Sequence, residues 1–295
     1  MLNLLKIFIQ GSFMVKAENF NKYLEKTVKK TIYDYDLLQK DEKIAIALSG
    51  GKDSILTLHM MDKFKDEFNL DLIAISIDEG ISGYRNEGIE VARKNAEDLG
   101  IKLIEKSFLN EFNFKLDNII GFYKSACIPC GVFRRYMLNK TAFEEGAVKI
   151  ATGHNLDDEI QSFLMTFSRA DFRRFSKFGP KLDAIHPKLI PRIKPLWNVL
   201  EKDVGTWAVL NNIKVHFAEC PYSYTSARSK MKEYLNKMES KRKGTKLNIL
   251  ESFKNTFELE KKPVILYECE KCGEPSSSNV CKACEMRNEI NKLIL

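Results

Sequence analysis

Two periodicities alternate along the first half of the chain. Short apolar runs predict buried strands at 43–48, 70–78, 101–108 and 148–153. Between these runs, apolar residues recur at helical spacing and predict helices at 56–64, 85–100 and 156–167. Strands that alternate with helices predict an α/β fold, a doubly wound parallel sheet with helices on both faces.

The remaining segments follow other patterns. Helical spacing predicts a helix at 16–40, and four prolines among basic residues predict a surface segment at 169–195. A helix followed by a strand is expected at 200–217, and basic helical sequence at 224–259. These changes predict four parts: an N-terminal extension and helix at 1–40, a catalytic domain at 41–220, a basic helical region at 221–264 and a small cysteine module at 265–295.

The composition is that of a soluble globular protein. Of the 295 residues, 44% are apolar and 29% are charged, and no run approaches the roughly 20 apolar residues that span a bilayer. The apolar first 15 residues lack a small-residue cleavage pattern, so we expect no signal peptide, and Met14 is an alternative start to Met1. The net charge of +7 favours anionic partners such as nucleotides or nucleic acid, although charge alone fits a basic protein without such a partner equally well.

Seven cysteines, an odd number, argue against a disulfide framework and for metal binding or catalysis. Four of them form a C-x2-C-x8-C-x2-C pattern, which is typical of a closed structural zinc site. They are Cys269, Cys272, Cys281 and Cys284.

The other three cysteines are Cys127, Cys130 and Cys220. Three thiolates can hold an iron–sulfur cluster with one iron left open to an external ligand. Zinc completed by a histidine such as His216 and a redox dithiol made of Cys127 and Cys130 are the alternatives, and the residues alone leave all three open.

The sequence SGGKDS, from Ser49 to Ser54, lies between a predicted strand and a predicted helix. Gly50 and Gly51 let backbone amides approach an anion, Lys52 adds positive charge, and the helix N-terminus favours phosphate. The sequence TGHNLDDE follows the fourth predicted strand and therefore lies at the same edge of the sheet. Its carboxylates, Asp157 and Asp158, could hold Mg²⁺ against phosphates. Alternatively, they are present only because a helix N-terminus favours negative charge.

Two basic segments are candidates for RNA phosphate contact, although each run alone also fits a solvated face. They contain Arg169, Arg173, Arg174 and Lys177, and then Arg228, Lys230, Lys232, Lys241, Arg242 and Lys243. For Phe172 and Phe175, burial is the preferred interpretation over stacking on bases.

SGGKDS resembles the phosphate loop of the PP-loop ATP pyrophosphatases, which adenylate a substrate and release pyrophosphate. Together with CIPCGVFRRY, ATGHNLDDE, AECPYS and the C-terminal double CxxC, in this order, it resembles the tRNA 2-thiolation family of TtuA-like and TtcA-like proteins. CGVFRR is most similar to the branch of cytoplasmic and archaeal wobble-uridine thiolases. The resemblance covers about residues 20–286. One departure is that close relatives often begin with another zinc finger, whereas this chain has no cysteine before Cys127.

The resemblance implies a set of site residues. Cys127, Cys130 and Cys220 would hold a [4Fe–4S] cluster that carries the transferred sulfur, or, in an older interpretation, a persulfide relay. Lys52, Arg134 and Asp158 would be catalytic, and RNA would contact Arg173, Arg174, Arg228, Lys230 and Lys232. ATP would be bound by Ser49, Gly50, Gly51, Lys52, Asp53, Ser54, Asp78, Arg134, Gly153 and Asp158.

The function implied is that of an ATP-dependent tRNA 2-thiolase of the cytoplasm, with ATP, Mg²⁺, a [4Fe–4S] cluster and Zn²⁺ as cofactors. Adenylation of C2 of a uridine, expected to be the wobble uridine, would precede replacement of its oxygen by sulfur. The sulfur donor would be free sulfide or a ubiquitin-like thiocarboxylate protein, and the protein would be a homodimer. Alternatives are a T-loop uridine or an anticodon-loop cytidine as target, a PP-loop ligase without RNA, and a non-catalytic RNA-binding adaptor.

Overall fold

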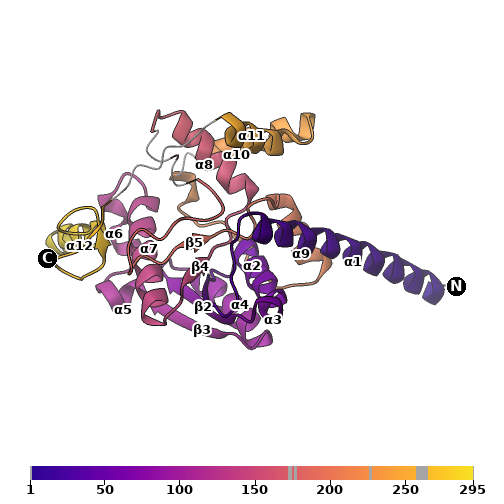
Figure 1. Ribbon diagram of the computed structural model, residues 1–295, viewed down its shortest axis with the longest axis horizontal. Helices are drawn as coiled ribbons and strands as arrows, with labels where there is room; N and C mark the ends of the chain where they lie inside the picture. Colours follow the sequence, from indigo (N-terminus) through magenta and orange to yellow (C-terminus); the bar gives the residue numbers. More distant parts are fainter. Residues whose placement is uncertain (1, 172–174, 176–177, 226–227, 257–264, 295) are drawn as a thin grey trace.

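The computed structural model describes residues 2–171, 175, 178–225, 228–256 and 265–294. Its centre is a five-stranded parallel sheet with the order β3-β2-β1-β4-β5 (Figure 1). The strands are β1 (Lys43–Ala47), β2 (Asp71–Asp78), β3 (Lys102–Ser107), β4 (Lys149–Ala151) and β5 (Arg192–Ile193). The chain adds β2 and β3 on one side of β1 and then β4 and β5 on the other. The strand order therefore reverses between β1 and β4, the place where doubly wound sheets bind ligands.

Helices connect these strands and cover the sheet. Before the fourth strand they are α1 (Leu2–Asp34), α2 (Lys52–Lys63), α3 (Lys65–Phe68), α4 (Arg85–Asp98), α5 (Phe108–Phe112), α6 (Leu116–Ile119), the short η1 (Ile120–Phe122) and α7 (Cys127–Glu144). After it they are α8 (Leu156–Phe167), α9 (Glu201–Leu210), η3 (Ser223–Thr225), α10 (Arg228–Lys241), α11 (Thr245–Thr256) and α12 (Lys282–Ile294). A two-stranded antiparallel sheet made of β6 (Tyr267–Glu268) and β7 (Pro275–Ser276) precedes α12.

Alternate residues of the strands fill two separate cores. Ile44 and Ile46 of β1 face a core shared with α1, α2, α4 and α9. Ala45 and its neighbours Ile73 and Ile75 of β2 face a core shared with α5, α7 and α12. Both faces of the sheet are therefore covered, which confirms the predicted α/β class.

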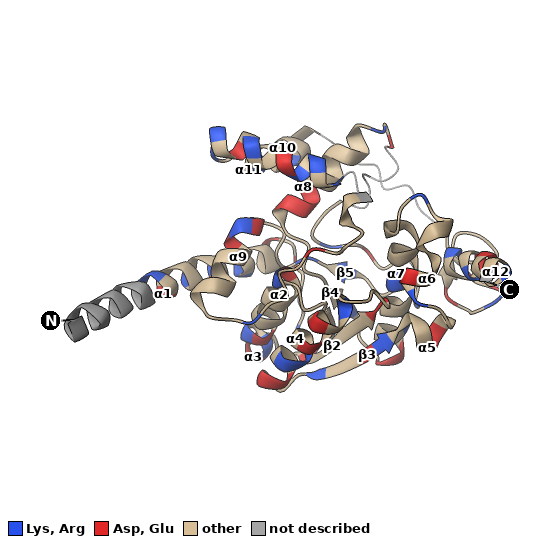
Figure 2. Ribbon diagram, turned by 180° about the vertical axis from the view of Figure 1, so that it is seen from behind, with Lys and Arg blue, Asp and Glu red and all other residues tan. Residues whose placement is uncertain are grey.

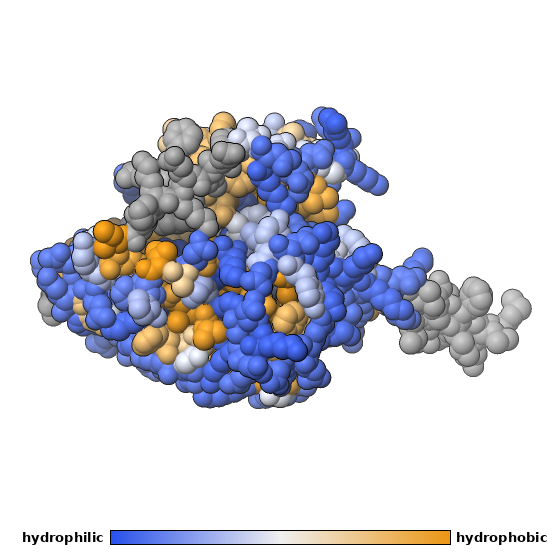
Figure 3. Space-filling view, viewed as in Figure 1, coloured by the Kyte–Doolittle hydropathy of each residue, from blue (hydrophilic) through white to orange (hydrophobic). Residues whose placement is uncertain are grey.

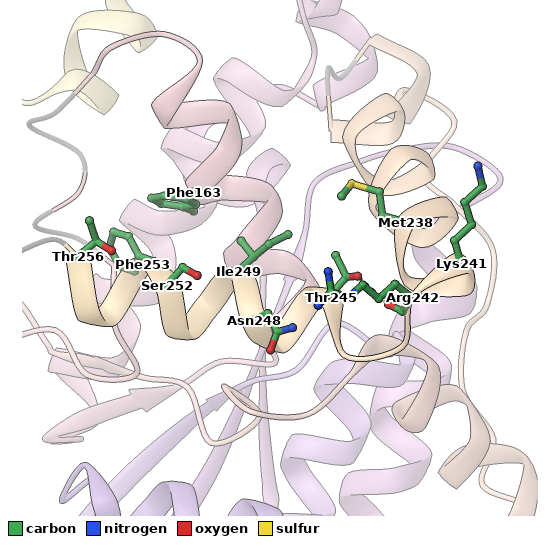
Figure 4. Close-up of a pocket in the computed structure, with 10 residues that line it drawn as sticks. All are labelled: Phe163, Met238, Lys241, Arg242, Thr245, Asn248, Ile249, Ser252, Phe253 and Thr256. Atoms are coloured by element: carbon green, nitrogen blue, oxygen red, sulfur yellow. Dashed lines mark hydrogen bonds between the residues drawn. The ribbon is translucent and has the colours of Figure 1, made fainter.

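A third, smaller core joins α8 to the basic helices α10 and α11. An apolar groove of 510 Å³ opens between these three helices, and Figure 4 shows Phe163, Ile249 and Phe253 along it, with Met238 and Lys241 of α10 at one end. Lys241 and Arg242, two of the candidates for RNA contact, line the groove, but none of the residues predicted to bind ATP does, so the phosphate site lies elsewhere.

Several predicted boundaries were wrong. The first helix ends at Asp34, before the predicted residue 40. The predicted surface segment contains the edge strand β5, and Phe175, Ile193 and Lys194 of that segment are buried. The strand expected before residue 217 is reduced to one bridge between His216 and Gly51.

The surface is mainly hydrophilic on the face seen in Figure 3. In Figure 2, the acidic start of α8 lies between the sheet and the helices α10 and α11, which carry many blue segments. No helix in the described part of the chain is long and apolar enough to cross a membrane.

Candidate functional site

The phosphate loop between β1 and α2 is shaped by two serines. Ser54 Oγ accepts a hydrogen bond from the Ser49 amide (3.1 Å) and donates one to the Gly51 carbonyl oxygen (2.9 Å). Gly51 is the residue before α2, so the first amides of this helix open onto the loop. Helix N-terminal amides favour an anion, and the loop therefore suits a phosphate group.

Two glycines allow close packing around this loop. Gly50 has a φ of +86°, and a Cβ there would lie 1.9 Å from the carbonyl oxygen of Gly88 in α4. A Cβ on Gly153, which follows β4, would lie 2.7 Å from the carbonyl carbon of Asp53. Side chains at these positions would collide with backbone atoms. Gly50 therefore lets the loop after β1 approach α4, and Gly153 lets the loop after β4 approach the start of α2.

Asn155 joins the same two loops through their carboxylates. Its Nδ2 donates a hydrogen bond to Asp53 Oδ1 (2.7 Å), and its Oδ1 accepts one from the Asp158 amide (3.0 Å). Asp158 Oδ2 accepts a weaker hydrogen bond from the Asn155 amide (3.4 Å), which completes a capping box at the start of α8. Asp53 and Asp158 therefore face one site, where their oxygens could hold Mg²⁺.

Six charged side chains surround this site, and we call them the charge cluster: Lys52, Asp53, Asp158, Glu201, Arg228 and Lys232. Glu201 Oε1 lies 2.9 Å from Lys52 Nζ and 2.8 Å from Lys232 Nζ. Arg228 Nη1 lies 3.0 Å from Asp158 Oδ1. Burial opposes ionisation of Lys52, but Asp53 and Glu201 raise the pKa of its ammonium group above the usual value. The phosphate loop therefore keeps its positive charge.

Burial shifts the pKa values of two groups at and just before the start of α8. Burial raises the pKa of Asp158 to about 6, although Arg228 opposes the shift. Burial and the nearby cations Lys194 and Arg228 lower the pKa of His154 to about 3. Asp158 is thus an ionised carboxylate only above about pH 6, and His154 is a neutral imidazole at physiological pH.

Asp157 has a structural partner instead of facing the charge cluster. Its carboxylate forms a buried ion pair with Lys246 of α11 and accepts a hydrogen bond from the Glu201 amide (2.8 Å). Lys246 Nζ also donates to Asn236 of α10 (2.6 Å). Asp157 therefore fastens α9, α10 and α11 to the start of α8.

The carboxyl end of β2 connects the phosphate loop with the first cysteine pair. Buried Arg85 donates a hydrogen bond to the Ser49 carbonyl oxygen (2.6 Å) and pairs with Glu79 (2.8 Å). Glu79 Oε1 in turn lies 3.5 Å from Arg134 Nη1 on α7. Asp78 caps the turn that follows β2 by accepting from the Gly80 amide (2.8 Å). A short chain of charges thus runs from the phosphate loop to the helix that carries Cys127 and Cys130.

Cys127, Cys130 and Cys220 are brought together from two distant segments. Cys127 and Cys130 begin α7, and Cys220 precedes η3. Burial, with Cys220 and Cys127 contributing, raises the pKa of Cys130 to about 11 against the opposing charge of Arg134. Without a bound metal, such a thiol is protonated at neutral pH. Within the described residues the three sulfurs do not all lie within 4.8 Å of one another, a wider spacing than that of thiolates bound to one zinc ion.

The four C-terminal cysteines are preassembled. The ligand atoms of Cys269, Cys272, Cys281 and Cys284 all lie within 4.8 Å of one another. The sulfurs of Cys272 and Cys281 are 3.7 Å apart, and sulfurs bound to one zinc at about 2.3 Å lie about 3.8 Å apart. Cys269 Sγ also accepts a hydrogen bond from the Cys281 amide (3.2 Å). The donor set and its spacing fit one tetrahedral zinc ion.

The structure thus places most predicted site residues around two neighbouring centres. The phosphate site gathers Lys52, Asp53, Gly153 and Asp158, whereas Arg134 lies with the three cysteines. Lys230 is exposed on α10, and Arg173 and Arg174 lie outside the described residues. Sequence reasoning missed Glu79, Arg85, Gly88, Asn155 and Glu201. Of these, Asn155 had a local signal, because it stands three residues before Asp158 as the cap of a capping box.

The parallel sheet and the glycine-bearing phosphate loop at its switch point define a PP-loop nucleotide-binding protein. The family model described as a PP-loop domain matches residues 17–232. Beyond this class, tRNA 2-thiolation protein NcsA of Haloferax volcanii is 34% identical over 92% of both chains. The tRNA-5-methyluridine(54) 2-sulfurtransferase of Pyrococcus horikoshii is 35% identical over 93% of this chain and 88% of its own.

A solved structure is similar over the same length. It is the U34-tRNA thiolase NcsA from Methanococcus maripaludis with its [4Fe-4S] cluster, at 35% identity and a TM-score of 0.80. The match covers 93% of this chain and 89% of that chain. The chain belongs to the PP-loop tRNA 2-thiolation family, in the branch that contains NcsA and cytoplasmic tRNA 2-thiolation protein 1.

Proposed function

We propose that this protein is an ATP-dependent tRNA 2-thiolase that acts on the wobble uridine. The observation that carries the proposal is the chain of contacts from Ser49 through Arg85 and Glu79 to Arg134. It holds a phosphate site and a three-cysteine site side by side, as activation by ATP followed by sulfur transfer requires. The similarity to a U34-tRNA thiolase supports the wobble base as target.

The first step uses the phosphate site. The C2 oxygen of the uridine attacks the α-phosphate of ATP, and pyrophosphate leaves. Lys52 and the amides at the start of α2 offset the charge that develops on the phosphate, and Asp53 and Asp158 hold Mg²⁺. Adenylation converts the C2 oxygen into part of a good leaving group, AMP.

The second step replaces that oxygen. Sulfide-level sulfur, from free sulfide or released by hydrolysis of a ubiquitin-like thiocarboxylate protein, forms a bond to C2, and the C2–O bond breaks as AMP leaves. Cys127, Cys130 and Cys220 would hold a [4Fe–4S] cluster, which would keep this sulfur beside the base. Arg134 lies between the three cysteines and Glu79 and offsets negative charge on the departing AMP. The target base must be unstacked to enter, and bases in RNA loops are the easiest to extrude.

Other parts of the molecule have supporting roles in this proposal. Zinc occupies the four-cysteine site and has no part in the chemistry. Exposed basic residues such as Lys230, together with Arg173 and Arg174, bind RNA phosphates. Free cysteines and an exposed cluster fit the reducing cytoplasm. Light scattering on the purified protein tests whether it forms a homodimer.

The proposal is tested on protein reconstituted with iron and sulfide without oxygen. Incubation with ATP, sulfide and tRNA should give 2-thiouridine, and mass spectrometry of nuclease fragments should place it at position 34. Pyrophosphate release should require tRNA. Thiolation at position 54 would overturn the wobble target, and tRNA-independent pyrophosphate release without thiolation would identify a PP-loop ligase.

The variant Cys220→Ala separates the two steps. It should retain tRNA-dependent pyrophosphate release and lose sulfur incorporation, because Cys220 has no contact with the phosphate loop in the proposed scheme. Asp158→Asn is the matched control and should lose both steps. Full thiolation by Cys220→Ala would contradict the three-cysteine cluster.

A further inference from the structure

The basic residues of helix α10 lie on two different faces. Arg228 and Lys232, four residues apart, lie on one face and form ion pairs with Asp158 and Glu201. Lys230 and Tyr234 are exposed on the rest of the helix. The sequence assigned Arg228, Lys230 and Lys232 to one RNA-binding run, but the structure separates Lys230 from the other two.

Lys232 is coupled directly to the phosphate loop. A single carboxylate oxygen, Glu201 Oε1, accepts hydrogen bonds from Lys52 Nζ (2.9 Å) and Lys232 Nζ (2.8 Å). Arg228 is coupled to the same site by Asp158, whose backbone and side chain meet the capping residue Asn155. Each of these two cations of α10 is therefore separated from the phosphate site by a single carboxylate, Glu201 for Lys232 and Asp158 for Arg228.

We propose that Arg228 and Lys232 bind the triphosphate of ATP, so that α10 completes the phosphate site that the loop after β1 begins. The charge cluster contains three cations and three carboxylates, and without a nucleotide these neutralise one another. Phosphate oxygens replace Glu201 and Asp158 as acceptors for Lys52, Lys232 and Arg228 when ATP binds. Asp53 and Asp158 then face Mg²⁺.

This inference rests on the proposed function only for the choice of ATP as nucleotide. It predicts that Arg228 and Lys232 contact phosphate groups that AMP lacks, so a comparison of ATP with AMP tests it. It also leaves Lys230, on the exposed face, to contact RNA. One helix would then contact both substrates on opposite faces.

The test is the affinity of Lys232→Ala for ATP and for AMP, measured by calorimetry without RNA. Lys232 is the better position for substitution, since its side chain is 37% exposed and its partner is Glu201, whereas Arg228 bonds to Ser162 as well as Asp158. Loss of one charged contact should weaken ATP binding about tenfold and leave AMP binding unchanged. Lys232→Arg should restore most of the ATP affinity.

Lys230→Ala is the matched control on the same helix. It should bind ATP like the natural protein and bind tRNA more weakly, whereas Lys232→Ala should change tRNA binding by less than about twofold. Unchanged ATP affinity in Lys232→Ala, or equal losses for ATP and AMP, would overturn the inference. Failure of the proposed function has a different signature: ATP binds to the natural protein, but tRNA does not trigger pyrophosphate release.

Discussion

Asn139 of α7 donates a hydrogen bond of 3.0 Å to Glu274, which lies between the two cysteine pairs of the C-terminal module. The same amide group donates to the Lys188 carbonyl oxygen (2.8 Å), and its oxygen accepts from the Ile190 amide (2.9 Å). One buried side chain thus joins the module, α7 and the segment before β5. The module also shares a core with α7, so we expect a metal bound by its four cysteines to affect the placement of α7.

We therefore expect loss of zinc to act on both metal centres. Cys281→Ala removes a buried ligand and should lower the Tm by at least about 5 °C. The iron bound per chain after reconstitution should also fall, because α7 carries Cys127 and Cys130. Lys282→Ala, an exposed neighbour, should change neither quantity. Unchanged iron content in a zinc-free variant would contradict the link.

Gly153→Ala should damage the phosphate site. A Cβ at this position would lie 2.7 Å from the Asp53 carbonyl carbon and would push the loops after β1 and β4 apart. Displacement on the ångström scale costs on the order of 100-fold in rate, which tRNA-dependent pyrophosphate release would measure. Gly205→Ala is the control, because nothing lies within 4 Å of a Cβ there. Within α9 it should stabilise the protein by about 1 kcal/mol.

The kcat/KM for ATP should depend on Asp158. Because the pKa of Asp158 is raised to about 6, kcat/KM should fall as the pH drops through that value and the carboxylate is neutralised. Because the pKa of Asp158 is raised from 3.8, protonation of this group favours the folded state. This contribution to stability is fully present below about pH 4 and is lost as the pH rises from there to about 6. Thermal unfolding measured at each pH should therefore separate the loss of activity from unfolding. Asp158→Asn should have low kcat/KM at every pH.

The buried pair of Asp157 and Lys246 should dominate the stability of the basic helices. Lys246→Met removes one partner, leaves a buried carboxylate unpaired and should cost about 3–5 kcal/mol. Calorimetry should show a Tm lower by about 10 °C. The double variant Asp157→Leu, Lys246→Met should recover part of the loss, since it leaves no unpaired charge. A double variant less stable than Lys246→Met would contradict this account.

The sequence predicted the strands of the sheet well where local signals were strong. The runs that became β1 and β2 are apolar and end at glycine or acidic residues, so their bounds were nearly correct. Strand β5 escaped prediction because its two residues, Arg192 and Ile193, stand between prolines in a basic segment. It exists through pairing with β4, a contact that no local pattern encodes.

The site was predictable to the extent that its residues form contiguous motifs. Spacing along the sequence is enough to predict a phosphate loop at Ser49 to Ser54 and a metal site at the four C-terminal cysteines. Spacing does not predict Glu201, because its importance comes from two lysines that reach it from positions 52 and 232. A run of basic residues likewise does not show which carboxylates its members pair with. The sequence therefore placed Arg228 and Lys232 with Lys230 in one predicted RNA-binding segment.

Helix α7 contacts two cysteine sites that differ in their exposure to solvent, and therefore to oxidants. None of Cys127, Cys130 and Cys220 is buried, whereas the module against which the later turns of α7 pack has one exposed cysteine, Cys272, and two buried ones, Cys269 and Cys281. We therefore expect oxidants to reach the three-cysteine site more readily, while the buried part of the four-cysteine module keeps the helix in place. An inactivated molecule retains the cradle for its cluster, so we expect new iron and sulfide to repair it without refolding or resynthesis.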